Sequence, residues 1–141
     1  MLWLIFLLLT TVSWAVYDLF FKAIDNNMNF FLALLIIGIF QVILALPFVV
    51  YDSYNGTLEY TAKGQIVSAI MGILLGLGTI FFFYAFKYGA NVSVAIPFYG
   101  VGALLIGVLG GVLIFKETIS PKLAIGFVFG IMSIILLSIE S

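Results

Sequence analysis

The chain has 141 residues, of which 65% are hydrophobic and only 8% are charged, with a formal net charge of -1 at pH 7. Because about a quarter of the residues of a typical water-soluble domain are charged, this composition excludes such a domain and indicates an integral membrane protein. The near-neutral charge provides no basic surface, so we expect no nucleic-acid partner. Neither Cys nor His occurs, which removes disulfides and the thiolate and imidazole ligands of metals. We expect no metal, no cofactor and no enzymatic activity, since no pairing of a nucleophile with a base is visible.

Five apolar runs are separated by short polar segments. A helix of about twenty residues, at 1.5 Å per residue, crosses a hydrocarbon core of about 30 Å. Helices joined by such short breaks must lie antiparallel. We therefore predict an all-α membrane bundle of five transmembrane helices, forming one domain over residues 1–141. The predicted helices span residues 2–21, 30–51, 65–86, 92–115 and 121–139.

The first apolar run has a second interpretation as a cleaved signal peptide, because Ser13 and Ala15 fit the small positions of a cleavage site. No Lys or Arg precedes the run, however, and it continues past that point. Both features are untypical of a signal peptide. We expect the run to remain as the first helix.

Polar residues of the first run repeat every four positions. One helical stripe contains Trp3, Thr10, Trp14 and Asp18, and Lys22 follows four residues after Asp18. Asp18 has two interpretations, a coupling or substrate-binding carboxylate and an interfacial ion pair with Lys22. Its position late in the run favours the ion pair.

Small residues mark two helix-packing faces. Gly72 and Gly76 lie four residues apart in the third run, and Gly126 and Gly130 do so in the fifth. This spacing allows another helix to approach closely. In the second run, Gln41 is the only strongly polar residue of its stripe, and we expect it to bond across a helix interface.

A substrate path is indicated near the third and fourth runs. Thr79 and Tyr84 follow the glycines of the third run, where a cavity can open. Pro97 interrupts the backbone bonding of the fourth run, and such irregularity inside a membrane needs protein or a water-filled cavity beside it. Pro97 with Tyr99 therefore marks either a path for a substrate or a simple helix kink.

The two short breaks contain residues typical of helix ends. Gly89 suits a helix C-cap, Asn91 and Ser120 suit N-caps, and Pro121 suits the first position of a helix. The polar segment 25–29 contains Asn residues that can also cap helices.

Two charged residues at the breaks are candidates for anchoring or coupling. Lys87 is expected to anchor a helix at the membrane surface. Glu117, beside Lys116, is either a coupling carboxylate or, more simply, an interfacial group that accepts hydrogen bonds from backbone donors of the next helix.

The residues around these breaks also carry a family resemblance. The pattern begins with Phe82-x-Tyr-Ala-x-Lys-x-Gly-Ala-Asn91, passes through Pro97 and Gly110, and continues through Phe115-Lys-Glu-x-Ile-Ser120 to the Gly126 and Gly130 pair. It resembles the EamA repeat of the drug/metabolite transporter superfamily. The resemblance is specific in the last three runs. The first two runs match in length and order, and the region from Trp14 to Lys22 is similar to the opening helix of the family. Most members carry two such repeats, whereas this sequence shows one.

The resemblance implies a transporter of small organic metabolites such as amino acids, working by alternating access in the plasma (inner) membrane of a prokaryote. The alternatives are a flippase of lipid-linked sugars and an accessory subunit of a membrane complex. An inverted-repeat transporter places its substrate site between two halves of opposite orientation, and this chain supplies only one half. We therefore expect a homodimer. An antiparallel arrangement of the two copies and a heteromeric partner chain are both alternatives. Three lysines fall on the side of the membrane that holds the N-terminus and two on the other side, so the positive-inside rule favours neither orientation of the chain strongly. The candidate path residues are Thr10, Trp14, Thr79, Tyr84, Pro97 and Tyr99.

Overall fold

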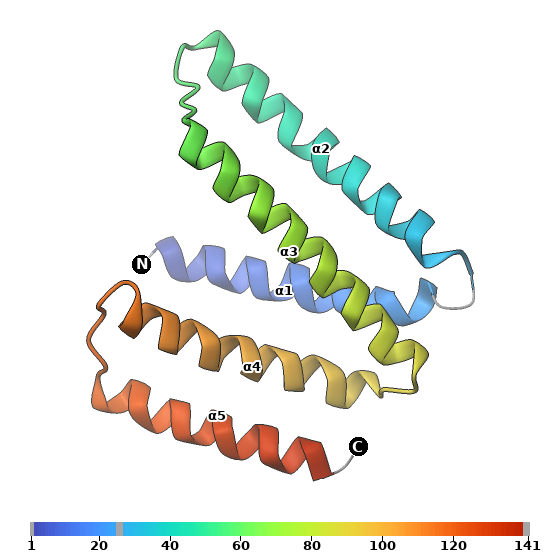
Figure 1. Ribbon diagram of the computed structural model, residues 1–141, viewed down its shortest axis with the longest axis vertical. Helices are drawn as coiled ribbons and strands as arrows, with labels where there is room; N and C mark the ends of the chain where they lie inside the picture. Colours follow the sequence, from blue (N-terminus) through green and yellow to red (C-terminus); the bar gives the residue numbers. More distant parts are fainter. Residues whose placement is uncertain (1, 25–26, 140–141) are drawn as a thin grey trace. The chain divides into compact units, whose positions relative to one another are not determined.

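The computed structural model describes residues 2–24 and 27–139, and every regular element in these ranges is a helix. The helices follow one another along the chain as the apolar runs predict (Figure 1). The prediction of an all-α membrane protein with five helices is confirmed. The helices are α1 (Leu2–Ile24), α2 (Phe30–Tyr54), α3 (Ala62–Lys87), α4 (Val92–Leu113) and α5 (Pro121–Ile139).

Four of these helices, α1 to α4, are long and apolar enough to cross a membrane. The shortest, α5, has 19 residues, which corresponds to about 28 Å of helix axis. Because that length is close to the thickness of the hydrocarbon core, α5 can also cross it with little tilt.

The helix bounds differ from the predicted bounds mainly around the longest loop. We predicted a loop over residues 52–64, but α2 continues to Tyr54 and α3 already begins at Ala62. The chain turns at Gly56, whose φ is 67°. The Thr61 hydroxyl accepts a hydrogen bond from the Gly64 N–H at 3.0 Å, so Thr61 caps α3 and sets its start. Polar residues alone had suggested a later start.

Side-chain caps form at two of the three predicted N-terminal positions. Asn29 precedes α2, and its Oδ1 accepts hydrogen bonds from the N–H groups of Phe31 at 2.9 Å and Leu32 at 3.3 Å. Ser120 precedes α5, and its hydroxyl accepts one from the Leu123 N–H at 3.2 Å. Asn91 is the N-cap residue of α4 as predicted, but its side chain makes no capping hydrogen bond.

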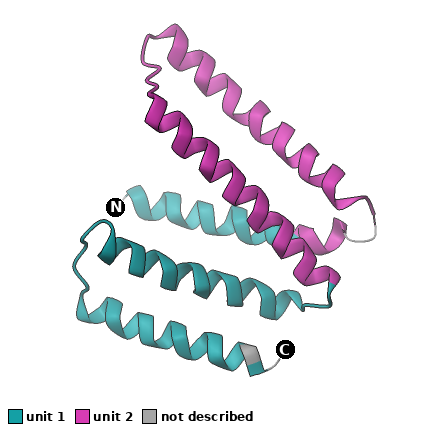
Figure 2. Ribbon diagram, viewed as in Figure 1, with its two compact units in different colours: residues 1–19, 88–141 teal, residues 20–87 magenta. Residues whose placement is uncertain are grey.

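Packing divides the chain into two compact units (Figure 2). The first comprises residues 1–19 and 88–141, and the second comprises residues 20–87. The assignment of residues 1–141 to one domain remains a prediction.

In the first unit, α4 and α5 pack closely at Gly130. A Cβ atom placed on Gly130 would lie 3.4 Å from both the Val101 Cγ1 and the Leu105 Cδ2 atoms of α4. A Cβ atom on Gly126 would have no neighbour within 4 Å. Of the two glycines predicted to mediate packing, only Gly130 therefore contacts a neighbouring helix in this unit.

In the second unit, aromatic rings join three helical segments. Phe21 lies against Phe30 of α2 and Phe82 of α3, with ring centroids 6.2 Å and 5.5 Å apart. Phe30 in turn stacks on Phe83 at 3.8 Å. Phe21 and Phe30 are almost completely buried, with 2% and 4% of their surface exposed. Offset and edge-to-face contacts of this kind stabilise a pair of rings beyond the area that they bury.

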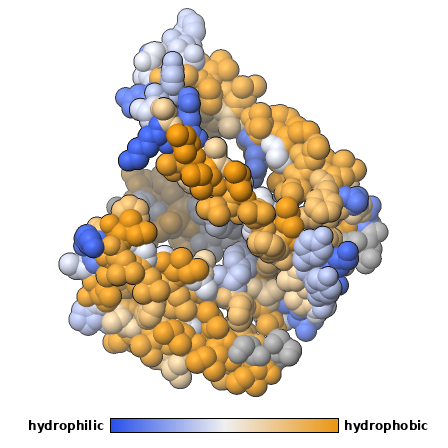
Figure 3. Space-filling view, in the orientation of Figure 1, coloured by the Kyte–Doolittle hydropathy of each residue, from blue (hydrophilic) through white to orange (hydrophobic). Residues whose placement is uncertain are grey.

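Most large apolar side chains lie on the outside of the helices. The visible helical surface in Figure 3 is predominantly hydrophobic, and hydrophilic residues gather near helix ends and loops. In water such a surface would cause aggregation. In a bilayer it is the surface that contacts lipid, as expected for a membrane protein.

Candidate functional site

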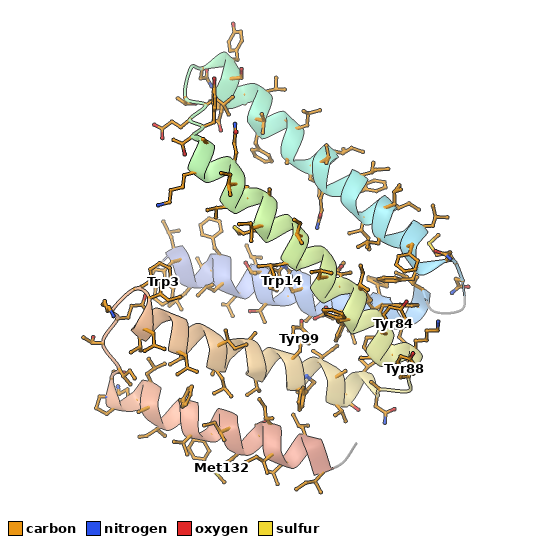
Figure 4. All side chains as sticks on the ribbon, viewed as in Figure 1. Trp3, Trp14, Tyr84, Tyr88, Tyr99 and Met132 are labelled. Atoms are coloured by element: carbon orange, nitrogen blue, oxygen red, sulfur yellow. The ribbon has the colours of Figure 1, made fainter. Side chains whose placement is uncertain are left out.

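A carboxylate and a phenol meet between two helices of the first unit. Asp18 of α1 is only 6% exposed, and its Oδ2 accepts a hydrogen bond from the Tyr99 hydroxyl of α4. Tyr99, labelled in Figure 4, is 39% exposed. The contact joins residues that are 81 positions apart in the sequence. It brings one predicted coupling residue together with one predicted path residue.

Asp18 therefore has a different partner from the one that the sequence favoured. We expected Lys22, one turn further along α1, to neutralise it at the membrane surface. In the described part of the chain the Lys22 side chain is exposed, whereas Asp18 is buried and bonds Tyr99. Four-residue spacing allows such an ion pair but does not require it, because packing of α4 can draw the carboxylate inward.

Pro97 lies two residues before Tyr99 and does not end its helix, since α4 continues from Val92 to Leu113. The missing N–H of Pro97 deprives the Ser93 carbonyl of its helical donor. Pro97 thus places an irregular stretch of backbone one turn or less from the phenol that holds Asp18.

Thr10 and Trp14 share the stripe of Asp18 but differ in their contacts. The Thr10 hydroxyl donates a hydrogen bond to the Phe6 carbonyl of the preceding turn at 2.8 Å. This bond satisfies the hydroxyl donor within the helix itself. Trp14, one turn before Asp18, is 62% exposed (Figure 4), so its ring face is open to a ligand or to lipid.

The remaining path residues, Thr79 and Tyr84, belong to the second unit. The Thr79 hydroxyl donates to the Leu75 carbonyl at 2.8 Å, as Thr10 does in its own helix. The Lys87 Nζ atom lies 5.6 Å from the centre of the Tyr84 ring, within the range of a cation–π interaction. Tyr84 also lies against Phe83. The Lys87 ammonium therefore lies over the ring of Tyr84 at the end of α3.

Glu117 approaches the end of its preceding helix. A Cβ atom on Gly111 would lie 2.5 Å from the Glu117 Oε2 atom. Lys116 beside it has a φ of 59°, which turns the chain back, and the Glu117 N–H donates to the Gly111 carbonyl at 3.0 Å. We expected the carboxylate to accept bonds from the next helix. The left-handed turn at Lys116 directs it towards α4 instead.

The structure thus groups the predicted residues into two local sets. Asp18 and Tyr99 are in direct contact, with Trp14 and Pro97 one turn or less away along their helices. Thr79, Tyr84 and Lys87 lie in α3. Their joint role in one substrate path remains a prediction. A shallow hollow on α5, lined by Ala124, Ile125, Val128 and Phe129, is apolar and contains none of them.

The contact between Asp18 and Tyr99 was missed by sequence reasoning. Each residue was singled out, but nothing in their spacing relates two positions so far apart. The usable signal was indirect, namely a carboxylate and a tyrosine each placed inside an apolar helix, where every polar group needs a partner.

A sequence model described as the EamA-like transporter family matches residues 1–139. The match therefore covers all five helices and both sets of candidate residues. No curated protein and no solved structure matches the chain.

Proposed function

The chain belongs to the EamA-like transporter family, and we propose that it carries small organic metabolites, such as amino acids, across the plasma membrane of a prokaryote by alternating access. The observation that carries the proposal is the family match over residues 1–139. The helices of the structure agree with it, because four of them can span a bilayer. Transport is thus the activity that both the family and the apolar helical fold favour.

Polar and aromatic groups inside the helices support a path for such a solute. Trp14 and Tyr99 have accessible rings in the first unit, and Tyr84 is partly accessible in the second. Trp and Tyr provide a large contact area with a polar group at one end, at a low cost in side-chain entropy. Such rings bind metabolites of varied shape.

We also propose that two copies of the chain form the complete path. Gly72 and Gly76 of α3 have no atom within 4 Å of an added Cβ, so this face is free to receive a helix. Gln41 lies in the middle of α2 and is exposed. An amide in hydrocarbon gains a hydrogen bond when a polar partner reaches it, typically for about 0.6 kcal/mol. A second copy, parallel or antiparallel, would supply helices for both faces.

Counterflow in reconstituted vesicles tests the transport proposal. Vesicles that contain the purified chain are loaded with a mixture of unlabelled amino acids, and uptake of each labelled amino acid is compared with protein-free vesicles. We expect accelerated uptake of at least one. The assay is then repeated with nucleosides and with amines. If none of the three classes exchanges, transport of small metabolites is contradicted and the accessory-subunit alternative is favoured.

A matched pair of tryptophans tests whether the path includes Trp14. Trp3 and Trp14 are both in α1 and both 62% exposed. We expect Trp14→Ala to lower the rate of counterflow, while Trp3→Ala leaves it near the wild-type rate. Equal effects of the two substitutions would show that Trp14 only contacts lipid.

The dimer is tested separately from transport. A reporter fused to the C-terminus reads the orientation of each copy, and cross-linking of purified protein in vesicles reads the assembly. Reporter signal on both faces supports an antiparallel, dual-topology dimer. Signal on one face alone contradicts that version, and a chain that transports without any cross-linked dimer contradicts the proposal of two copies.

A further inference from the structure

Asp18 is a buried carboxylate for which the structure provides a hydrogen-bond donor but no cation. Its contact in the described chain is the Tyr99 hydroxyl, a neutral donor. Lys22 is exposed one turn away. The lysines of the first unit, Lys116 and Lys122, follow α4, and the helix from Tyr99 to Leu113 is about 21 Å long at 1.5 Å per residue. Within the first unit, no described lysine therefore neutralises Asp18.

An unneutralised carboxylate inside a membrane protein is costly, so such residues usually belong to a pathway for ions or substrates. The Tyr99 hydroxyl satisfies only one of the positions at which the carboxylate can accept a hydrogen bond. No side-chain oxygen or nitrogen of the described residues is both fully buried and without a partner. The Asp18 Oδ1 atom, which accepts no hydrogen bond from the described residues, thus retains a small accessible surface through which a donor can reach it.

The surroundings of Asp18 favour an organic cation. Trp14 lies one turn before Asp18 on the same stripe and is largely exposed, and Tyr99 is itself partly exposed. Aromatic faces attract cations through the ring quadrupole, and the attraction is stronger where water is excluded. A carboxylate beside two accessible rings combines a charge partner with surfaces that an ammonium and its attached carbon atoms can cover.

We propose that the Asp18 carboxylate, held in place by the Tyr99 hydroxyl, binds the ammonium group of the transported solute, so that the substrates are amines or amino-acid derivatives with a free primary ammonium. This inference rests on the proposed transport function and narrows its substrate class. Trp14 contacts the carbon chain next to the ammonium. The solute replaces the missing cation, and Tyr99 orients the carboxylate without neutralising it.

A pair of probes with the same side chain, one with a free amine and one with an acetylated amine, tests the proposal. Leucinamide carries a primary ammonium at pH 7, whereas N-acetylleucinamide has the same side chain and no charge. Because a ligand that binds only the folded state raises its stability, thermal unfolding of the purified full-length protein reports binding. We expect leucinamide to raise the unfolding temperature in proportion to the logarithm of its concentration, and N-acetylleucinamide to leave it unchanged.

Two variants and one control test whether the Asp18 carboxylate binds the ammonium of leucinamide. Asp18→Asn keeps an acceptor for Tyr99 and a similar volume, so the fold is retained, but leucinamide affinity falls about tenfold or more because the charge is lost. Tyr99→Phe removes the orienting hydrogen bond and lowers affinity about threefold to tenfold. The control is Glu59→Gln, which removes an exposed carboxylate in the loop between α2 and α3 and leaves the affinity unchanged.

The outcomes separate this inference from the transport proposal. Equal stabilisation by the two probes, or undiminished leucinamide binding by Asp18→Asn, overturns the ammonium site. Proton uptake that depends on Asp18 without any binding of leucinamide also overturns it, in favour of a proton site. If the vesicles exchange neutral solutes and Asp18→Asn does not change the rate, transport is supported and the ammonium site is contradicted. Leucinamide binding that requires Asp18, in a protein that exchanges no solute, supports the site and contradicts transport.

Discussion

Phe30, the first residue of α2, stacks on Phe83 of α3 with the ring centroids 3.8 Å apart and the ring planes inclined by 13°. Phe30 also contacts Phe21 of α1, so that one ring connects three helical segments of the second unit. In lipid the helices gain little from the hydrophobic effect, because lipid tails are as apolar as the side chains. Close ring packing must therefore provide much of the stability of this unit.

Replacing Phe30 should consequently destabilise the protein. We expect Phe30→Ala to lower the free energy of unfolding by about 2 kcal/mol, which is below the cost of a similar change in a water-soluble core because no transfer from water is involved. Phe48→Ala in the same helix is the control, since Phe48 is 72% exposed. Unfolding in detergent micelles with increasing dodecyl sulfate, followed by circular dichroism, measures both. A loss for Phe48→Ala as large as that for Phe30→Ala would refute the role of the ring stack.

The two asparagine N-caps allow a second comparison. The Asn29 side chain accepts hydrogen bonds from two backbone N–H groups at the start of α2, whereas the Asn91 side chain accepts none at the start of α4. We expect Asn29→Ala to cost about 1 kcal/mol, the usual contribution of a formed cap, and Asn91→Ala to cost clearly less. The same unfolding measurement compares the two variants. Equal losses of stability would show that the capping hydrogen bonds of Asn29 do not stabilise the protein.

Much of the fold follows from local features of the sequence. The number of helices and the start of α5 at Pro121 were predicted correctly, because the apolar runs are long and Ser120 with Pro121 is a strong helix-start signal. The start of α3 was predicted three residues late. Thr61 caps that helix through a hydroxyl in a polar segment, and polarity alone does not distinguish a cap from a loop.

Contacts between distant residues could not be predicted in the same way. Asp18 was assigned to Lys22 because only neighbours on one helix are visible in a sequence, whereas its observed partner, Tyr99, depends on how α4 packs against α1. Similarly, Gly126 and Gly130 look identical in the sequence, yet only Gly130 has neighbours from α4. Local chemistry defines which groups need a partner, and the packing of helices decides which partner they find.

The turn between α3 and α4 depends on a glycine. Gly89 has a φ of 96°, in a region that residues with a Cβ avoid at a cost of roughly 1–2 kcal/mol. We expect Gly89→Ala to destabilise the protein by about that amount and Gly89→Val by more. Gly100→Ala is the control, because Gly100 lies within α4 and an added Cβ has open space. If Gly89→Ala matched the stability of Gly100→Ala, the turn would have to adopt another conformation in the membrane.

Gly130 lies at the contact between α4 and α5. At Gly130 an added Cβ already reaches van der Waals distance of Val101 and Leu105, at 3.4 Å from each, so a larger side chain must push the helices apart. We expect Gly130→Ala to be tolerated and Gly130→Leu to cost about 1–3 kcal/mol, as overpacking usually does. Gly126→Leu places the same side chain one turn earlier, where the chain itself has no atom within 4 Å, and the stability of the isolated chain should hardly change. A loss of cross-linked dimer in Gly126→Leu, with unfolding of the chain unaffected, would instead assign that open face to a second copy.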